Sequence, residues 1–321
     1  MKNLYISGSS GMVGSTLVKH FKSQDNYNVI STNRDQLDLL NRESVDTFFL
    51  DNKIDSMIIA AAKVGGIWAN ENFPQEFIYE NLMIQNNLID AAYKNNIKKL
   101  LFLGSSCIYP KQANQPIQEN ELLSGPLEET NEPYAIAKIA GIKLCESYNR
   151  QHNTDFRSLM PTNLYGPGDN FDYKKSHVIP ALIRKFHDAK TQKKSHVSVW
   201  GSGEPRREFM HVNDLANACS FILNMPTEVY WKDISQTCSH INVGCGADIS
   251  IKNLALMIKE IVNFEGEIEF DTSKKDGPLK KLLNINKMKD LGWSPSIQLD
   301  NGLESTYRWF QESQLKFRGQ E

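Results

Sequence analysis

The sequence predicts an α/β protein whose main part is a doubly wound parallel sheet, followed by a smaller α/β C-terminal part. Short β-rich runs alternate with segments of helical periodicity from the first residue onward, which is typical of parallel strands joined by crossover helices. A glycine-rich loop lies between the first run and the first helical segment. After about residue 166 the alternation becomes less regular, and Gly166-Pro167-Gly168 interrupts it. We therefore expect a second, smaller unit beyond that point.

Five apolar runs are predicted to be strands of the parallel sheet. Their side chains are apolar on both faces, as expected of strands that are covered by helices on either side. The runs are residues 4–6, 29–32, 57–60, 100–103 and 156–160. Helical periodicity predicts helices at 13–22, 75–94, 132–148, 178–189, 214–223, 251–262 and 301–311, and a further strand is expected at 197–200.

The composition excludes several classes of protein. The chain has 321 residues, with 36 Lys+Arg against 38 Asp+Glu and a net charge of −2, so it lacks the basic excess of a nucleic-acid-binding protein. With 40% hydrophobic residues it can form a large core, and its length suggests about two domains. Its apolar stretches are far shorter than the ~20 residues that cross a bilayer. The N-terminus lacks the apolar core of a signal peptide, and we expect a cytoplasmic protein.

The cysteines indicate neither a disulfide framework nor a zinc site. Their number is odd, and no pair has CxxC or Cys/His ligand spacing. We therefore expect free thiols and no bound metal ion. The five are Cys107, Cys145, Cys219, Cys238 and Cys245.

A GxxGxxG motif, formed by Gly8, Gly11 and Gly14, lies directly after the first strand and before the first helix. Without side chains, the backbone N–H groups can approach a pyrophosphate, whose charge is stabilised at the positive end of the helix. Three glycines alone can also be ordinary turn residues, but the strand-loop-helix context favours a dinucleotide site. The predicted cofactor contacts in this loop are Gly8, Ser9, Ser10, Gly11, Met12, Val13 and Gly14.

The end of the second strand bears on which dinucleotide binds. An NAD site would usually have Asp or Glu here for the ribose 2′-hydroxyl, whereas this strand ends in Thr32-Asn33-Arg34. Arg34 can pair with a 2′-phosphate through a charge-assisted fork, which favours NADP(H). An exposed loop arginine is the competing interpretation, and Asp35 leaves some use of NAD open.

Tyr134 and Lys138 are four residues apart on a predicted helix with Pro133 in its first turn, so they share one face. A nearby ammonium is expected to lower the tyrosine pKa from about 10, which suits a proton donor to a carbonyl that accepts hydride. Lys138 can also hold the nicotinamide ribose. Ser105 follows the strand 100–103, at the strand end where doubly wound folds bind ligands, and can polarise the same carbonyl. A Tyr and a Lys at this spacing are also common on ordinary helices.

Together, the glycine loop, Ser105 and the Tyr134–Lys138 pair resemble the extended short-chain dehydrogenase/reductase family over nearly the whole chain. Further segments narrow this resemblance to the GDP-L-fucose synthases, a homodimeric, NADPH-dependent family that epimerises and reduces GDP-4-keto-6-deoxy-D-mannose. These segments are Ala62-Lys63-Val64-Gly65-Gly66-Ile67, Gly104-Ser105-Ser106-Cys107-Ile108-Tyr109-Pro110, Pro161-Thr162-Asn163-Leu164-Tyr165-Gly166-Pro167 and Trp200-Gly201-Ser202-Gly203.

The resemblance implies a cysteine base and a histidine acid, at Cys107 and His177. The substrate's 4-keto group acidifies both C3 and C5, so one acid/base pair can invert both centres before C4 is reduced. Thiolate character in cationic surroundings suits the base, and titration near neutrality suits the acid. Without the resemblance, Cys107 would be interpreted as a small buried hydrophobe and His177 as a loop residue.

The resemblance also implies which residues line the cofactor and the substrate. Lysines on helices are usually solvated, so the competing interpretation of Lys185 is an exposed surface lysine. Lys280 and Lys281 could equally be solvated charge. The cofactor set beyond the glycine loop and Arg34 is Leu103, Gly104, Ser105, Ser106, Lys138, Pro161, Thr162, Asn163, Leu164 and His177, and the substrate set is Lys185, Trp200, Arg207 and Asp276.

Several hypotheses follow for the whole chain. We expect an NADP-binding Rossmann domain at 1–165 with 205–235, a substrate-binding domain at 166–204 with 236–321, and a homodimer formed through helices 75–94 and 132–148. The expected activity is conversion of a GDP-4-keto-sugar to GDP-L-fucose, with no nucleic-acid or membrane partner. The alternatives are a GDP-L-colitose synthase, which inverts C5 only, a redox-neutral epimerase of the same fold, and a binding protein for NADP with an inactive site.

Overall fold

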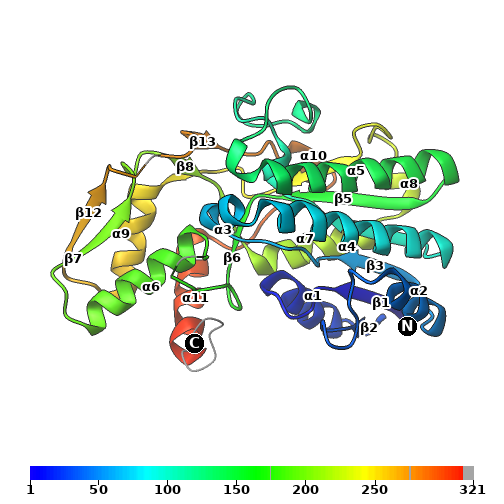
Figure 1. Cartoon of the computed structure of the whole chain (residues 1–321), viewed down its shortest axis with the longest axis horizontal. Helices are drawn as coiled ribbons and strands as arrows, with labels where there is room; N and C mark the ends of the chain where they lie inside the picture. Colours follow the sequence, from blue (N-terminus) through cyan, green and yellow to red (C-terminus); the bar gives the residue numbers. More distant parts are fainter. Residues whose placement is uncertain (174, 275, 314–321) are drawn as a thin grey trace.

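A computed structural model, which describes residues 1–173, 175–274 and 276–313, has one central sheet of six strands in the order β10-β5-β4-β3-β1-β2 (Figure 1). Every neighbouring pair is parallel. The predicted doubly wound parallel sheet is therefore confirmed. Its strands are β1 (Lys2–Ser7), β2 (Tyr27–Ser31), β3 (Ser56–Ile59), β4 (Lys99–Leu103), β5 (Asp155–Pro161) and β10 (His240–Val243).

Alternating side chains of the sheet point into two hydrophobic cores. Tyr5 and Phe102 belong to the core beneath α2, α4 and α5, whereas Ile6 and Leu101 belong to the core beneath α1 and α7. This alternation explains why the strand sequences are apolar on both faces. The helices are α1 (Met12–Lys22), α2 (Arg42–Asp51), α4 (Pro74–Lys94), α5 (Glu132–His152) and α7 (Val212–Asn224).

A third core lies in the smaller body at the other end of the molecule (Figure 1). Here α6 (Val178–Thr191), α9 (Ile251–Val262) and α11 (Leu299–Ser313) pack together beside a parallel pair of strands, β7 (His196–Trp200) and β12 (Glu267–Asp271). The predicted strand at 197–200 and helix at 251–262 are confirmed.

Short elements connect the two bodies. A small sheet has the order β11-β8-β13, and β6 pairs with β9. Among the described residues, no helix is both long and apolar enough to cross a membrane. The short strands are β6 (Asn163–Tyr165), β8 (Arg206–Arg207), β9 (Phe209–His211), β11 (Ile249–Ser250) and β13 (Lys280–Lys281), and the short helices are α3 (Ile67–Asn72), η1 (Ser106–Ile108), η2 (Glu119–Glu121), η3 (Glu129–Asn131), α8 (Thr227–Tyr230) and α10 (Asn286–Asp290).

Two strands lie outside the parts to which the expected domain division assigns them. β10 falls within 236–321, yet it pairs with β5 at the edge of the large sheet. β8 falls within 205–235, yet it pairs with β11 and β13. Both strands are too short to show a period, and long-range pairing rather than local sequence determines where they lie.

A buried ion pair ties β5 of the large sheet to the end of α7 and to α8. The Arg157 side chain is fully buried and pairs with Asp155 at 2.7 Å. It also donates to the carbonyl oxygens of Ile222 and Met225, at the C-terminal end of α7. The Asp155 carboxylate in turn accepts from the Thr227 hydroxyl. Every arginine contact is therefore made inside the protein, where an unpaired charge is costly.

We expect Arg157→Met to reduce the free energy of unfolding by about 3–5 kcal/mol, because it leaves the Asp155 carboxylate buried without its cation. Arg42→Met is the matched control. Arg42 pairs with Asp46 and Asp90, and the three side chains are 38%, 38% and 25% exposed, so each pair is expected to contribute only about 0–1 kcal/mol. Urea denaturation of both variants measures the difference. An equal loss of unfolding free energy in the two variants would contradict a larger contribution from the buried pair.

Candidate active site

The glycine loop packs tightly against the end of β3. Gly8 has a φ of +75°, and a Cβ at this position would lie 2.7 Å from the Ala61 backbone. A Cβ at Gly14 would overlap the Gly8 carbonyl oxygen. Gly11 is the N-cap of α1, has no side chain to cap the helix, and leaves room for a Cβ, which would lie 3.6 Å from the Gly8 carbonyl oxygen. Open space above the N–H groups of a helix end fits a pyrophosphate.

The loop after β2 carries the predicted 2′-phosphate contact. Asn33 and Gln36 hold this loop through reciprocal bonds between backbone N–H groups and side-chain oxygens, both 2.9 Å long. Arg34 and Asp35 are exposed within it. Ser9 joins it to the glycine loop by donating to the Thr32 carbonyl oxygen at 2.9 Å. The position fits an NADP site, and the role of Arg34 stays a prediction.

The predicted serine, tyrosine and lysine meet at the carboxyl end of β4. Ser105 caps the short helix η1 and accepts the Cys107 N–H through its Oγ at 3.2 Å. The Tyr134 hydroxyl hydrogen-bonds the Ser105 side chain. Lys138 donates to the Leu103 carbonyl oxygen at 2.9 Å, and its Nζ lies 5.9 Å from the centre of the Tyr134 ring. Tyr134 and Lys138 therefore share one face of α5, as the spacing predicts.

The predicted lowering of the Tyr134 pKa is wrong for this arrangement. Burial raises the tyrosine pKa, a nearby charge on Cys107 raises it further, and the bond to Ser105 opposes them. Burial also lowers the pKa of Lys138 to about 7, so only a fraction of the molecules have this amine protonated near neutral pH. Desolvation therefore outweighs the expected attraction between the two groups. A tyrosine that stays protonated suits the part of a proton donor.

Cations surround Cys107, and one of them comes from β13. Lys281 Nζ lies 3.8 Å from the Cys107 sulfur. Lys281 is the register partner of Arg207 on β8, and Arg207 is close enough to interact with a charge on Cys107. The interpretation of Lys281 as solvated charge is thus wrong, whereas its neighbour Lys280 forms a surface ion pair with Asp248 at 3.4 Å. Sequence alone could not show that Lys281 rather than Lys280 lies beside Cys107, because only the pairing of β13 with β8 distinguishes the two lysines.

His177 lies on a different segment, at the N-cap of α6. The preceding residues rest on the loop after β3, since Gly66 N–H donates to the Lys175 carbonyl oxygen at 3.2 Å. A Cβ at Gly66 would lie 2.9 Å from the Ser176 carbonyl oxygen. This close approach explains why the second residue of the Gly65-Gly66 pair is a glycine. His177 is exposed, yet desolvation by surrounding protein atoms lowers its pKa. Within the described residues we find no hydrogen bond between His177 and Cys107.

The predicted substrate residues lie around the smaller body. Trp200 is 64% exposed, and the Lys185 Nζ is 5.1 Å from its ring centre. Asp276 accepts the Ser202 N–H at 2.9 Å and its hydroxyl at 2.6 Å. Arg207 donates to the Pro278 carbonyl oxygen, and burial lowers its pKa. Trp200 and the two cations thus offer an aromatic surface and positive charge, which suit a base and a diphosphate.

The turn after β5 is held rigidly beside this region. The Thr162 N–H donates to the Val243 carbonyl oxygen at 3.0 Å. The Thr162 hydroxyl and the Asn163 amide both donate to the Glu208 carbonyl oxygen, at 3.2 and 2.8 Å. Pro161 and Leu164 flank this turn, so its backbone is fixed at the carboxyl end of a sheet strand, where doubly wound folds bind ligands.

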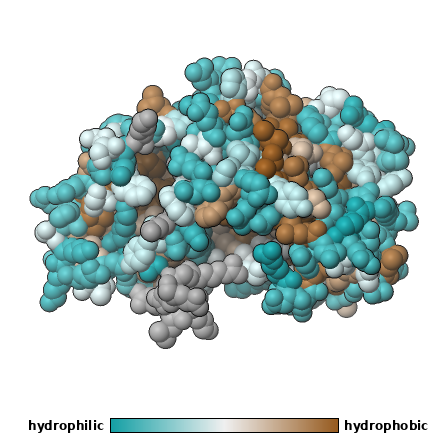
Figure 2. Space-filling model, viewed as in Figure 1, coloured by the Kyte–Doolittle hydropathy of each residue, from teal (hydrophilic) through white to brown (hydrophobic). Residues whose placement is uncertain are grey.

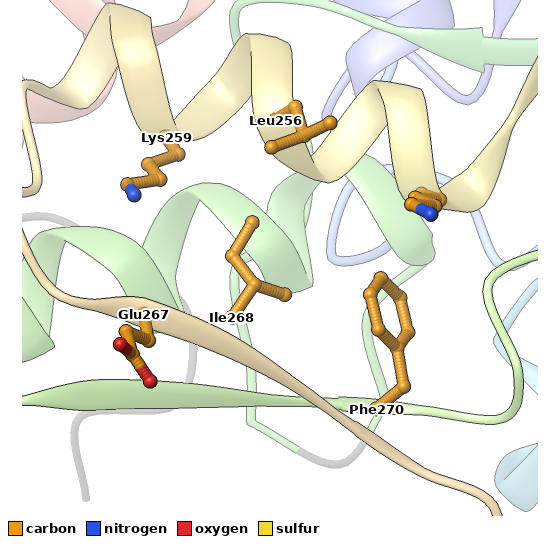
Figure 3. A pocket seen from close by; sticks show the side chains of 6 residues that line it. Leu256, Lys259, Glu267, Ile268 and Phe270 are labelled. Atoms are coloured by element: carbon orange, nitrogen blue, oxygen red, sulfur yellow. The ribbon is translucent and has the colours of Figure 1, made fainter.

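Two hollows on the smaller body contain no predicted site residue among the residues that line them. A groove of about 340 Å³ between α9 and β12 is lined by Leu256, Ile268 and Phe270, with charged side chains at its rim (Figure 3). Among the described residues, no group of three or more His, Cys, Asp or Glu side chains could hold a metal ion. The predicted serine and lysine instead lie at the carboxyl end of β4, and Lys185 and Trp200 lie on α6 and β7.

Comparison with known proteins decides the family. Residues 4–244 match the model of the NAD dependent epimerase/dehydratase family. The chain belongs to this family. It is 52% identical over 318 residues to the GDP-L-fucose synthase of Escherichia coli (strain K12), which covers 99% of each chain. It is 40% identical over 308 residues to the GDP-L-colitose synthase of Yersinia pseudotuberculosis, covering 96% of this chain and 97% of the other.

A solved structure of similar shape bears on the cofactor. It is a GDP-D-glycero-L-gluco-heptose synthase from Campylobacter jejuni in the presence of NADPH, with a TM-score of 0.90, 38% identity, and coverage of 97% of this chain and 98% of the other. These matches confirm the resemblance to the GDP-L-fucose synthases, and with it the predictions of an enzyme and of NADP(H) as its cofactor. The roles of individual residues stay predictions.

Gly11→Ala and Gly14→Ala separate cofactor binding from folding. The Gly14 methyl would overlap backbone, and we expect it to destabilise the protein by about 1–3 kcal/mol. The Gly11 methyl has room within the protein but fills the approach of a pyrophosphate. We expect it to keep the melting temperature and to weaken NADPH binding, measured by fluorescence titration, by on the order of tenfold. Unchanged NADPH affinity in Gly11→Ala would contradict the site.

Lys138→Met tests the buried amine through pH. The folded pKa of about 7 lies below the ordinary lysine pKa of 10.5, so between these pH values the unfolded chain holds a proton that the folded protein has released. Stability should therefore rise with pH in this window, by at most about 1.4 kcal/mol per unit. Urea denaturation from pH 7 to 9 should show a smaller rise for Lys138→Met. Parallel curves for the two proteins would contradict the lowered pKa.

Proposed function

We propose that this enzyme epimerises GDP-4-keto-6-deoxy-D-mannose at C3 and C5 and then reduces it at C4 to GDP-L-fucose. The observation that carries the proposal is the place of Cys107, a thiol 3.8 Å from the Lys281 ammonium and beside the Ser105–Tyr134 pair. A reductase needs only a proton donor at the ketone. A thiol next to that donor supplies a base for the carbons on either side of the same ketone.

In the epimerisation stage, Cys107 removes a proton from C3 or C5 and His177 returns one from the opposite face of the ring. The exposure of the His177 side chain allows it to exchange protons with solvent between turnovers. Ser105 and Tyr134 donate hydrogen bonds to the ketone oxygen, where negative charge develops as each proton leaves. Lys281 and Arg207 place positive charge near the Cys107 sulfur.

In the reduction stage, NADPH supplies the hydride to C4 when it is bound. Tyr134 gives its proton to the C4 oxygen, and its raised pKa ensures that the proton is present at neutral pH. Ser105, already bonded to Tyr134, holds the same oxygen in place. Lys138, at the β4 end, holds the nicotinamide ribose by our proposal. The Thr162–Asn163 turn and Leu103, Gly104 and Ser106 complete the cofactor contacts.

The GDP-sugar is placed by the smaller body. We propose that Lys185 and Arg207 pair with its diphosphate, that Trp200 packs on the base or sugar, and that Asp276 contacts the substrate when its bonds to Ser202 open. Residues 1–165 with 205–235 would then hold the cofactor and residues 166–204 with 236–321 the substrate, apart from β8 and β10. A cytoplasmic location stays a prediction from the sequence.

A homodimer through α4 and α5 is part of the same proposal. Ile136 on α5 is 42% exposed, and Tyr79 on α4 is 54% exposed. Figure 2 shows hydrophobic residues gathered over α5 on the visible face. An apolar patch of this kind supports contact with a second copy of the chain, in which two helices from each protomer would pack together.

A GDP-L-colitose synthase is the second candidate, favoured by the relative of that name at 40% identity. Its 3-deoxy substrate needs inversion at C5 only, so the same residues would serve. The higher identity, 52%, to a GDP-L-fucose synthase supports the first candidate. Turnover of each 4-keto sugar nucleotide with NADPH distinguishes them.

We expect product formed in deuterated water to carry deuterium at both C3 and C5, as counted by proton NMR. Cys107→Ser should slow this exchange by about 10²–10⁴-fold, because general-base catalysis typically contributes that much. Tyr134→Phe should slow reduction by a similar factor while exchange continues, so that epimerised ketone accumulates.

The positions of the deuterium label also show which results would contradict the proposed function. Deuterium at C5 alone would favour the colitose enzyme, and label at neither carbon would leave a plain reductase. Consumption of NADPH at the parent rate by Tyr134→Phe would mean that another group donates the proton.

A further inference from the structure

Glu208 follows the substrate arginine directly, yet its side chain turns inward and is fully buried. Its Oε1 accepts the Gly246 N–H at 2.6 Å, and its Oε2 accepts the Leu283 N–H at 3.1 Å. The carboxylate also fills the space beside Gly244, where a Cβ would overlap it. Burial raises its pKa, while backbone N–H groups oppose the shift. No ion pair to it is found in the described part of the chain, so backbone donors satisfy the charge.

These bonds connect the carboxylate to the strand that carries Lys281. Leu283 comes two residues after Lys281, and β13 runs parallel to β8 with Lys281 opposite Arg207. A two-residue strand gains little from its own ladder, so its position depends on neighbouring contacts. Loss of the Leu283 bond would therefore loosen Lys281, whose Nζ is 3.8 Å from the Cys107 sulfur.

The main chain of Glu208 adds a second connection. Its carbonyl oxygen accepts from the Thr162 hydroxyl and the Asn163 amide, which lie in the proposed nicotinamide turn. Glu208 thus connects the turn after β5, the strand β8 that carries Arg207, and the segment after β13. Each of these carries a group assigned above to the cofactor, the substrate or the thiol.

We propose that Glu208 is a positioning residue for the epimerisation step, acting through Lys281 and Arg207, which its buried carboxylate holds in place beside Cys107. The inference rests on the proposed function. It requires a carboxylate, because two oxygens accept two N–H groups at once, whereas an amide would turn an NH2 donor toward one of them. Displacement of a reacting group by about 1 Å can cost on the order of 10²-fold in rate.

E208Q tests the proposal against a matched control, E146Q. Glu146 is also buried, at 2% exposure, and its Oε1 accepts the Ser239 N–H at 3.0 Å on the distant half of α5. We expect E208Q to slow deuterium exchange at C3 and C5 at least about tenfold and to raise the KM of the GDP-sugar, with NADPH affinity within about twofold of the parent. E146Q should lower the melting temperature and leave these kinetic values unchanged.

Equal exchange rates and KM values in E208Q and E146Q would overturn the proposal, since Glu208 would then be structural only. If E208Q does not fold, E208D decides the question. It keeps the charge but is one methylene too short to reach both N–H groups, so it should show the same slowed exchange, and parent-like exchange would contradict us. Absence of exchange in the parent enzyme itself would instead contradict the proposed function.

Discussion

The burial of Tyr134 against Ser105 and Cys107, at the carboxyl end of β4, is the constraint on which the rest of the site depends. Burial raises the phenol pKa and so keeps its proton in place until charge develops on a neighbouring oxygen. The same burial lowers the pKa of Lys138 to about 7. Desolvation is therefore the largest cause of the shifts in both pKa values.

The second requirement is positive charge at the thiol, and strands outside the large sheet supply it. β4 places Cys107, while β8 and β13 bring Arg207 and Lys281 toward it. The two strands are only two residues each, so they owe their position to tertiary bonds such as those of Glu208. The chemistry thus depends on how firmly the smaller body is joined to the sheet.

Much of the fold could be predicted from the sequence because burial on both faces leaves apolar runs. β10 was not predicted because the polar residues His240 and Asn242 interrupt its apolar pattern, although both side chains are buried. Neighbouring contacts rather than local sequence determine β13. The motif residues at β4 and α5 were found from spacing, but the sign of the Tyr134 shift was not. Sequence proximity to Lys138 suggests attraction, and only the structure shows that Lys138 is buried and Tyr134 partly buried, so that desolvation has the larger effect on both pKa values.

A crystal structure with NADP⁺ and a GDP-sugar bound tests the central claim most directly, through the place of the Cys107 sulfur relative to the sugar ring. The account predicts sulfur at roughly 3–3.5 Å from C3 or C5, the His177 ring on the opposite face, and the Tyr134 hydroxyl on the C4 oxygen. A ring that presents C4 to Tyr134 while the sulfur contacts neither C3 nor C5 would contradict it.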